Sequence, residues 1–356
     1  MKGRIIVNNE FIVPTGKIIK EYLDENNINQ KELCARIGMS EKHISNLLNG
    51  NSRLTEEFAL KLEKVLVGIP ASYWLNYEIK YREMLARDAE VFKLNQCSID
   101  DVAKKFRFKE VFAGLGLTLI EQAIAMLKLL KISDFANFDA TYSNLAVEFM
   151  EDGGEKETIV VWLNLCESEI EIQNVDIDGI AYESKEVEKS LEKFKKIANN
   201  TNVELSINSC RKLCNKLGIY LVLCEAITNS KVRGALTTYK GHPTIYLSRR
   251  YKSHDNIWFA FIHEIAHLLK HYNKKDIIIS YEDTECSTNS KELEANKYAR
   301  DFFINPREYE EFVSLNQFTA ESIKRFAKKE NVLPGIVVAR LQHDKKVGYE
   351  KFSYLK

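Results

Sequence analysis

Residues 261–269 read Phe-Ile-His-Glu-Ile-Ala-His-Leu-Leu, and this stretch carries the strongest chemical signal in the chain. On a helix, His263 and His267 lie one turn apart on the same face, so both imidazoles can reach one metal ion. Zinc binds imidazole nitrogens, and a hydrolytic zinc site keeps three protein ligands so that water can hold the fourth position. Glu264 is then expected to act as the general base that takes the proton of that water.

A second helix downstream supplies carboxylates for the third ligand. Residues 291–303 read Lys-Glu-Leu-Glu-Ala-Asn-Lys-Tyr-Ala-Arg-Asp-Phe-Phe. Glu292 and Asn296 lie one turn apart on one helix face, whereas Glu294 points roughly 160° away from Glu292. We therefore expect Glu292 to bind Zn²⁺, with Glu294 as the alternative. Asn296 is expected to orient a ligand histidine without binding the metal itself.

Several residues near these motifs have open roles. His271 lies two helical turns after His263, about 12 Å along the axis, so it is expected to be a structural or substrate-side residue. Cys286 lies between the two motifs. It is expected to be either a thiolate that tunes the metal or an ordinary loop cysteine. A donor opposite Glu264 is expected to stabilise the oxyanion of peptide hydrolysis. The sequence leaves five candidates for it: Tyr246, His254, His271, Tyr281 and His343.

The two motifs together resemble the ImmA/IrrE family of metallo-endopeptidases, whose sequences carry His-Glu-x-x-His, then Glu-x-Glu-Ala-Asn-x-Phe-Ala and a proline. This chain has Tyr298 where that pattern has Phe, and Asn305-Pro306 follows at the expected distance. The resemblance implies a zincin-like domain. It also implies zinc-dependent cleavage of a protein, characteristically a repressor with a helix-turn-helix domain.

Three buried strands are expected ahead of the zinc helix, over residues 218–224, 232–239 and 243–247. The last two are expected to join near Gly241-His242. An exposed edge of such a sheet can pair with an extended peptide and hold its scissile bond over the metal. Residues 244–247 are the candidate edge.

The N-terminal region predicts a helix-turn-helix arrangement. A first helix starts at Thr15, a second runs from the N-cap Asn29 to Ile37, and a third starts at Ser40 and ends at Asn49-Gly50. In this motif the third helix enters the major groove with its first turns on the base edges. The residues expected to contact bases or phosphates are Gln30, Ser40, Glu41, Lys42, His43, Ser45, Asn46 and Arg53.

The charge of this region does not by itself require DNA. Residues 1–80 hold 11 Lys+Arg and 10 Asp+Glu, whereas DNA-binding domains usually show a basic surface, so a protein-binding bundle is the alternative. Residues 14–85 resemble HigA-type antitoxins of the XRE, or phage-repressor, class, and 70–76 match their Trp-Leu-Asn segment. This resemblance implies a homodimer that binds a double-stranded operator with paired half-sites.

The composition is ordinary for a soluble globular protein, and the helix and strand patterns predict an α+β fold that is mainly helical. The chain has 356 residues, 45% hydrophobic and 29% charged, and no net charge. We expect a helix-turn-helix bundle over 1–80, a helical connector over 81–200, a zincin-like peptidase domain with a small sheet over 201–312 and a helical extension over 313–356. No apolar run approaches about 18 residues and no signal peptide is seen, so a cytoplasmic location without membrane contact is expected.

The sequence thus predicts a DNA-binding transcriptional regulator fused to a zinc endopeptidase that cleaves a repressor-like protein. The alternative is a non-catalytic HigA-like antitoxin or repressor, with a structural or sensory metal site and a cognate toxin as partner. Catalysis is favoured because Glu264 has no role in a purely structural site, which four protein ligands would normally close.

Overall fold

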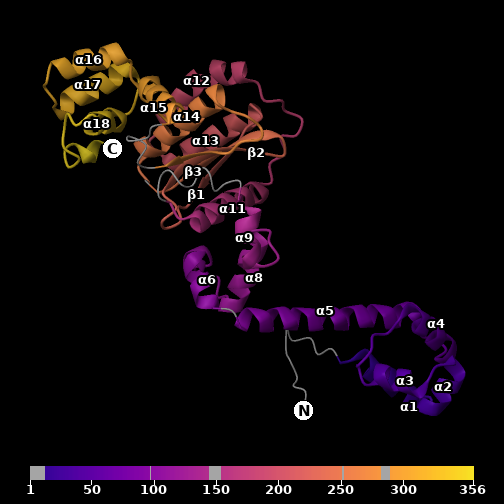
Figure 1. Cartoon of the computed structure of the whole chain (residues 1–356). Helices are drawn as coiled ribbons and strands as arrows, with labels where there is room; N and C mark the ends of the chain where they lie inside the picture. The colour runs from indigo at the N-terminus through magenta and orange to yellow at the C-terminus, as the bar shows by residue number, and fades with distance from the viewer. Residues whose placement is uncertain (1–12, 97, 144–153, 251, 282–288) are drawn as a thin grey trace. The chain divides into compact units, whose positions relative to one another are not determined.

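The computed structural model describes residues 13–96, 98–143, 154–250, 252–281 and 289–356 (Figure 1). The chain forms two compact units, Met1–Ile99 and Asp100–Lys356. The expected fold class is confirmed, because both units are mainly helical and one small sheet lies in the second. The four domain ranges expected from the sequence stay predictions. Cys286 lies outside the described residues.

The first unit contains the expected helix-turn-helix. Helices α1 (Thr15–Glu25), α2 (Gln30–Ile37) and α3 (Glu41–Leu48) are followed by α4 (Glu56–Val65) and the long α5 (Ala71–Gln96). Asn29 caps α2 by accepting a hydrogen bond from the Glu32 backbone N–H, and Ser40 caps α3 in the same way through His43. Gly38 ends α2 with a φ of 72°, a left-handed conformation that glycine adopts without strain.

Two close contacts fix α3 against its neighbours in this unit. A Cβ at Gly16 would collide with the backbone oxygens of Leu47 and Leu48, so only glycine lets α1 approach the end of α3. The buried Glu78 of α5 accepts hydrogen bonds from the Thr15 hydroxyl and from the Leu54 backbone N–H. The outer face of α3 is therefore presented on a rigid base.

The second unit begins with short helices, some of which contact the long helix that follows them. They are α6 (Ile99–Lys105), α7 (Phe108–Val111), α8 (Leu119–Leu129), η1 (Phe135–Asn137) and α9 (Phe138–Thr141), followed by α11 (Lys156–Gln173). Lys105 pairs with Glu157 at 2.9 Å and Arg107 with Glu155 at 2.8 Å, which ties α6 and the turn after it to the start of α11.

A four-stranded sheet forms the centre of this unit. Its strands are β1 (Tyr220–Cys224), β2 (Val232–Tyr239), β3 (His242–Ser248) and β4 (Ile278–Tyr281), in the order β1-β3-β2-β4. Three strands match the prediction, and β4 was not predicted. The expectation that residues 244–247 form an exposed edge is wrong, because β3 pairs with β1 on one side and with β2 on the other. The edge strands are β1 and β4.

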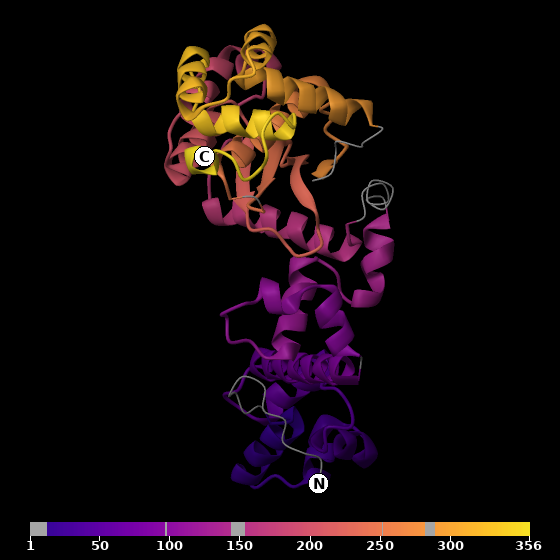
Figure 2. The same cartoon turned by 90° about the vertical axis from the view of Figure 1, so that its left-hand side faces the viewer.

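Helices cover both faces of the sheet, as Figures 1 and 2 show. On one face α11 packs against β1, and Trp162 makes an edge-to-face contact with Tyr246 of β3. On the other face lie α12 (Ser184–Ala198), α13 (Val203–Lys216) and α14 (His254–Lys270). Because side chains alternate along a strand, Leu221 and Ile245 enter the core on this second face.

The C-terminal helices belong to the same hydrophobic core. They are α15 (Ser290–Phe303), α16 (Pro306–Ser314), α17 (Ala320–Glu330), α18 (Pro334–His343) and the short η4 (Ser353–Leu355). Ile323 and Val337 are fully buried in the core that also contains Trp258 of α14. None of the described helices has both the length and the apolar character needed to cross a bilayer.

Candidate metal centre and nucleic-acid interface

Helix α14 places the two histidines in the interior of the second unit. Every residue of this helix from Ala260 to Leu268 is buried. Four of its apolar side chains belong to the hydrophobic core of the unit: Trp258, Phe261, Ile262 and Ile265. His263 is 2% exposed and His267 is fully buried. Buried polar rings need partners, and the partners come from the neighbouring helix α15.

Glu292, in the first turn of α15, closes a cluster with the two histidines. His267 Nε2 lies 2.9 Å from Glu292 Oε1, and His263 Nε2 lies 3.2 Å from Glu292 Oε2. The two Nε2 atoms are themselves 3.0 Å apart. The three ligand atoms lie within 4.8 Å of one another, which makes this a group able to hold one metal ion.

The donor set of this cluster fits a divalent ion. Two imidazole nitrogens and one carboxylate are the three protein ligands of many catalytic zinc sites. Around an ion with bonds of about 2.0 to 2.1 Å, tetrahedral ligand atoms lie about 3.3 Å apart, close to the observed separations. Two facing Nε2 atoms cannot both direct a proton at the same carboxylate without repelling each other. A central cation satisfies all three groups at once.

A line of hydrogen-bonding groups extends behind His267. Its Nδ1 lies 3.1 Å from Nδ1 of His271, and His271 Nε2 lies 3.0 Å from Glu294 Oε2. If His267 uses Nε2 for a metal, its Nδ1 carries the proton and donates to His271, which in turn donates to Glu294. Glu294, the alternative ligand, instead pairs with His271 and with Lys270 at 2.6 Å.

Glu264 lies beside the cluster and faces strand β2. Its side chain is fully buried, and both of its oxygens lack a hydrogen-bond partner in the described part of the chain. A Cβ at Gly234 of β2 would meet the Glu264 carboxylate, so the missing side chain there creates the space for it. Glu264 is thus held in a deep, closely fitting space.

Burial and neighbouring groups shift the pKa values of Glu264 and Glu292 in opposite directions. Burial raises the pKa of Glu264 to about 7, partly opposed by His267 and Ser280. Burial also disfavours the charged form of Glu292, but hydrogen bonds from His263 and His267 bring its pKa down to about 2. One carboxylate is thus set to stay ionised as a ligand, while the other can exchange a proton near neutral pH.

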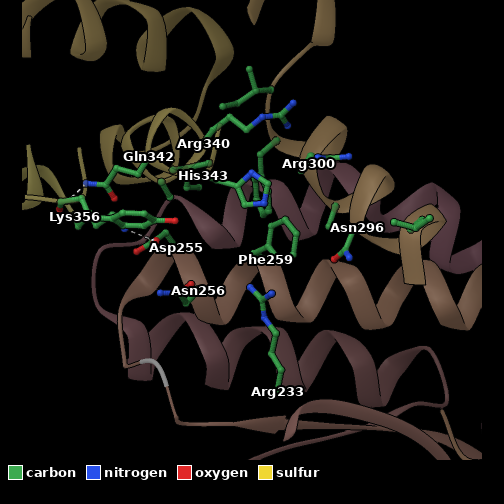
Figure 3. Close-up of a pocket in the computed structure, with 17 residues that line it drawn as sticks. Arg233, Asp255, Asn256, Phe259, Asn296, Arg300, Arg340, Gln342, His343 and Lys356 are labelled. Atoms are coloured by element: carbon green, nitrogen blue, oxygen red, sulfur yellow. Dashed lines mark hydrogen bonds and ion pairs between the residues drawn. The ribbon is translucent and has the colours of Figure 1, made fainter. Parts of the chain in front are cut away.

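A cavity of about 660 Å³ adjoins the cluster between β2, α14, α15 and α18. Figure 3 shows Arg233 rising from the sheet toward Phe259, with Asn296 on the neighbouring helix and His343 above them. Phe259 lies one turn before His263, and their ring centroids are 6.4 Å apart. The cavity therefore ends beside the candidate ligands.

Asn296 lines this cavity. The Nδ1 atom of His267 faces His271, and Nδ1 of His263 has no hydrogen-bond partner among the described residues. Support of a ligand histidine by Asn296 therefore stays a prediction. Of the oxyanion candidates, His343 also lines the cavity.

Sequence reasoning missed Arg233 and Gly234. The pairing of β2 with β4 shifts its register between Val232 and Gly234, a bulge that turns Arg233 toward α14. There its guanidinium lies over the Phe259 ring, 4.5 Å from the centroid. A glycine inside a strand pattern often marks a bulge or a close approach of another group, so Gly234 was the available signal.

The residues expected to contact DNA are all exposed or half-buried in the first unit. Lys42 and His43 are exposed on α3, and Asn46 is half-buried on the same helix. The Gln30 amide donates to the Glu41 backbone oxygen at 3.3 Å, which joins the starts of α2 and α3. The remaining members of the set are exposed or half-buried: Ser40, Glu41, Ser45 and Arg53.

Comparison with known families gives the class of each unit. Residues 19–73 match the helix-turn-helix family, and residues 214–342 match the IrrE N-terminal-like domain of peptidase family M78. The chain therefore joins an N-terminal helix-turn-helix domain of the XRE type to a C-terminal IrrE-like peptidase domain.

A curated relative matches the first of these domains. The chain is 38% identical over 63 residues to the uncharacterized HTH-type transcriptional regulator YddM of Escherichia coli (strain K12). The match covers 18% of this chain and 66% of that protein. The finer resemblance to HigA-type antitoxins stays a prediction.

Proposed function

We propose that this protein is a DNA-binding transcriptional regulator whose second unit is a zinc-dependent endopeptidase that cleaves a repressor-like regulatory protein. The observation that carries the proposal is the buried cluster of His263, His267 and Glu292, with the carboxylate of Glu264 beside it. Three protein ligands leave a metal coordination position for solvent. A structural site would have no use for Glu264.

Each residue has one task in this proposal. His263, His267 and Glu292 hold the ion, which when bound acidifies water and stabilises negative charge on the peptide carbonyl. Glu264 accepts a proton from the attacking water on a carboxylate oxygen and delivers it to the nitrogen of the leaving amine. His271 and Glu294 keep the His267 ring in the tautomer that points Nε2 at the ion.

The position of strand β4 favours a peptide substrate that binds in an extended conformation. It is an edge of the sheet, its partner strand β2 carries Gly234, and Ser280 of β4 contributes to the pKa of Glu264. An extended segment that pairs with this edge would bring its backbone alongside the general base. This edge takes the place of residues 244–247 in the earlier expectation.

The exposed apolar side chains of the first unit favour a dimer as the form that binds the operator. Large apolar side chains remain exposed on its α4 and α5 helices, among them Leu60 and Ile79 at 55% and Phe92 at 65%. Exposed apolar surface of this kind is typical of contacts between protein chains. A dimer would bind half-sites about one helical turn apart. We expect the protein to act in the cytoplasm, where operator DNA lies.

The experiment uses the zinc-loaded full chain and its Glu264→Gln variant. Purified helix-turn-helix repressors, the chain itself and a proteome-derived peptide library are incubated with each, and new termini are identified by mass spectrometry. The variant should keep one zinc per chain and cleave about 100-fold to 10,000-fold more slowly, because it lacks the base. Glu192→Gln, an exposed residue of α12, is the matched control and should cleave normally.

Two outcomes contradict the proposal. Proteolysis by Glu264→Gln at the wild-type rate would remove the role of this residue. A zinc-loaded wild-type protein that leaves every substrate intact, yet binds DNA or a toxin, would show that the metal is structural or sensory. The protein would then be a HigA-like antitoxin or repressor.

A further inference from the structure

The cavity beside the metal centre has a positive lining. Among the described residues, its wall contains the cations Arg233, Arg300, Arg340 and Lys356 but only one acidic side chain, that of Asp255. Lys356 pairs with Asp255 at 3.0 Å. Arg340 pairs at 2.7 Å with Asp344, just outside the cavity. Arg233 and Arg300 are the other two cations of this wall.

Arg300 has no counter-charge in the described part of the chain. It is half-buried on α15, its Nε is buried without a hydrogen-bond partner, and no ion pair with a described carboxylate involves it. The guanidinium of Arg233 lies over the Phe259 ring on the same wall. Partly burying the Arg300 guanidinium without a counter-charge is costly, so the cavity favours an anionic occupant.

The position of the cavity indicates which anion enters it. Phe259 lies one turn before the candidate ligand His263, Asn296 lies one turn after Glu292, and Arg233 directly precedes the glycine that contacts Glu264. An extended peptide advances about 3.3 Å per residue, and the Phe259 and His263 ring centroids are 6.4 Å apart. A side chain in the cavity would thus come from a residue within two positions of the bond over the metal.

We propose that this cavity is a specificity subsite that binds the carboxylate of a Glu or Asp side chain, one or two residues from the scissile bond of the protein substrate. The proposal rests on the peptidase function proposed above. Arg300 forms the charged hydrogen bonds to the carboxylate. Arg233, which lies next to Phe259 in Figure 3, adds a second positive charge, and Phe259 packs against the methylene groups of the bound side chain.

Binding is measured first, because it does not need cleavage. Two acetylated and amidated hexapeptides, Ala-Ala-Glu-Ala-Ala-Ala and its Gln counterpart, are titrated calorimetrically into the zinc-loaded Glu264→Gln full chain. The Glu peptide should bind at least about tenfold more tightly, as a charged hydrogen bond implies. Adding Arg300→Gln should abolish this difference. Adding Arg300→Lys should keep part of it, because the positive charge remains.

Lys297→Gln is the matched control. Lys297 is exposed on the same helix and lies outside this cavity, so the same loss of charge should leave the preference for Glu intact. Equal binding of the two peptides, or a preference that survives Arg300→Gln, would overturn the proposal. So would glutarate that binds as tightly as the Glu peptide and depends on Arg300, because the cavity would then serve a free small anion.

A cleavage experiment separates this proposal from the peptidase function. Wild-type protein should cut a proteome-derived peptide library with Glu or Asp enriched within two residues of the cut, and Arg300→Gln should lose the enrichment. Cutting without any preference for acids would overturn the subsite and leave the peptidase intact. Absence of all cutting would overturn the peptidase, while the calorimetric comparison would still decide whether the cavity binds a peptide carboxylate.

Discussion

Gly234 shows how a single missing side chain shapes the proposed active site. A Cβ at this position would meet the Oε1, Cδ and Cγ atoms of Glu264. The backbone of Gly234 is not in the left-handed region, so alanine would introduce this steric conflict without backbone strain. The position therefore tests whether the place of the Glu264 carboxylate matters for the chemistry.

We expect Gly234→Ala to move the Glu264 carboxylate by about 1 Å and to lower kcat for peptide cleavage about 100-fold. The three atoms nearest to this Cβ all belong to Glu264 and none to a proposed metal ligand, so the zinc content should stay unchanged. Steady-state kinetics together with metal analysis measures both quantities. Gly179→Ala is the control, because a Cβ there has no neighbour within 4 Å. Wild-type kcat in Gly234→Ala would show that the position of Glu264 is not limiting.

Helices α14 and α15 act together because each supplies part of the metal cluster. His263 and His267 come from one helix and Glu292 from the other. The contact of His271 with Glu294 joins the same two helices one turn further along. A shift of either helix would therefore disturb both the ligand set and the groups behind it.

Helix α3 is the element that should read DNA. We expect Asn46→Ala to weaken binding of a duplex selected from random sequences by about 5-fold to 150-fold, because an Asn that pairs with adenine contributes about 1–3 kcal/mol. The loss should be largest at one base position in each half-site. Fluorescence anisotropy with single-base variants of the selected duplex measures this.

Asn76→Ala is the matched control for this experiment, because Asn76 is an exposed asparagine of α5 and not of α3. It should bind the duplex like the wild type. Uniform weakening by Asn46→Ala across all sequences would instead assign Asn46 to phosphate contacts. Unchanged binding would remove it from the interface.

At the scale of the whole molecule, the candidate metal cluster and helix α3 lie in different compact units, divided after Ile99. The cluster of His263, His267 and Glu292 lies entirely in the second unit. A ligand stabilises only the cooperative unit that binds it. Removal of the metal should therefore act on one unit and leave the other unchanged.

We expect chelation of zinc by EDTA to lower the melting temperature of the second unit by about 10 °C. Free metal at about 1,000 times its Kd stabilises by about 4 kcal/mol, and each kcal/mol corresponds to about 2–4 °C in a unit of this size. Differential scanning calorimetry should show a second transition that does not move. Glu292→Gln should no longer respond to EDTA. A single transition that shifts as a whole would contradict the independence of the two units.

Local patterns in the sequence determined the elements and much of the candidate site. The i,i+4 spacing of His263 and His267, the cap residues Asn29 and Ser40, and the apolar runs of three strands act over one or two turns, so they can be read without a fold. Glu292 could also be predicted as a candidate ligand from the sequence, because Asn296 lies on the same helix face and Glu294 does not.

Only the tertiary structure decided which strand lies at the edge and what surrounds the metal cluster. Strand pairing is non-local, so the run at 244–247 could not reveal that it lies between two other strands. The bulge that turns Arg233 toward Phe259, the contact of Gly234 with Glu264 and the charged cavity near Arg300 all join segments far apart in the chain. Their geometry depends on packing between elements, and no local spacing encodes it.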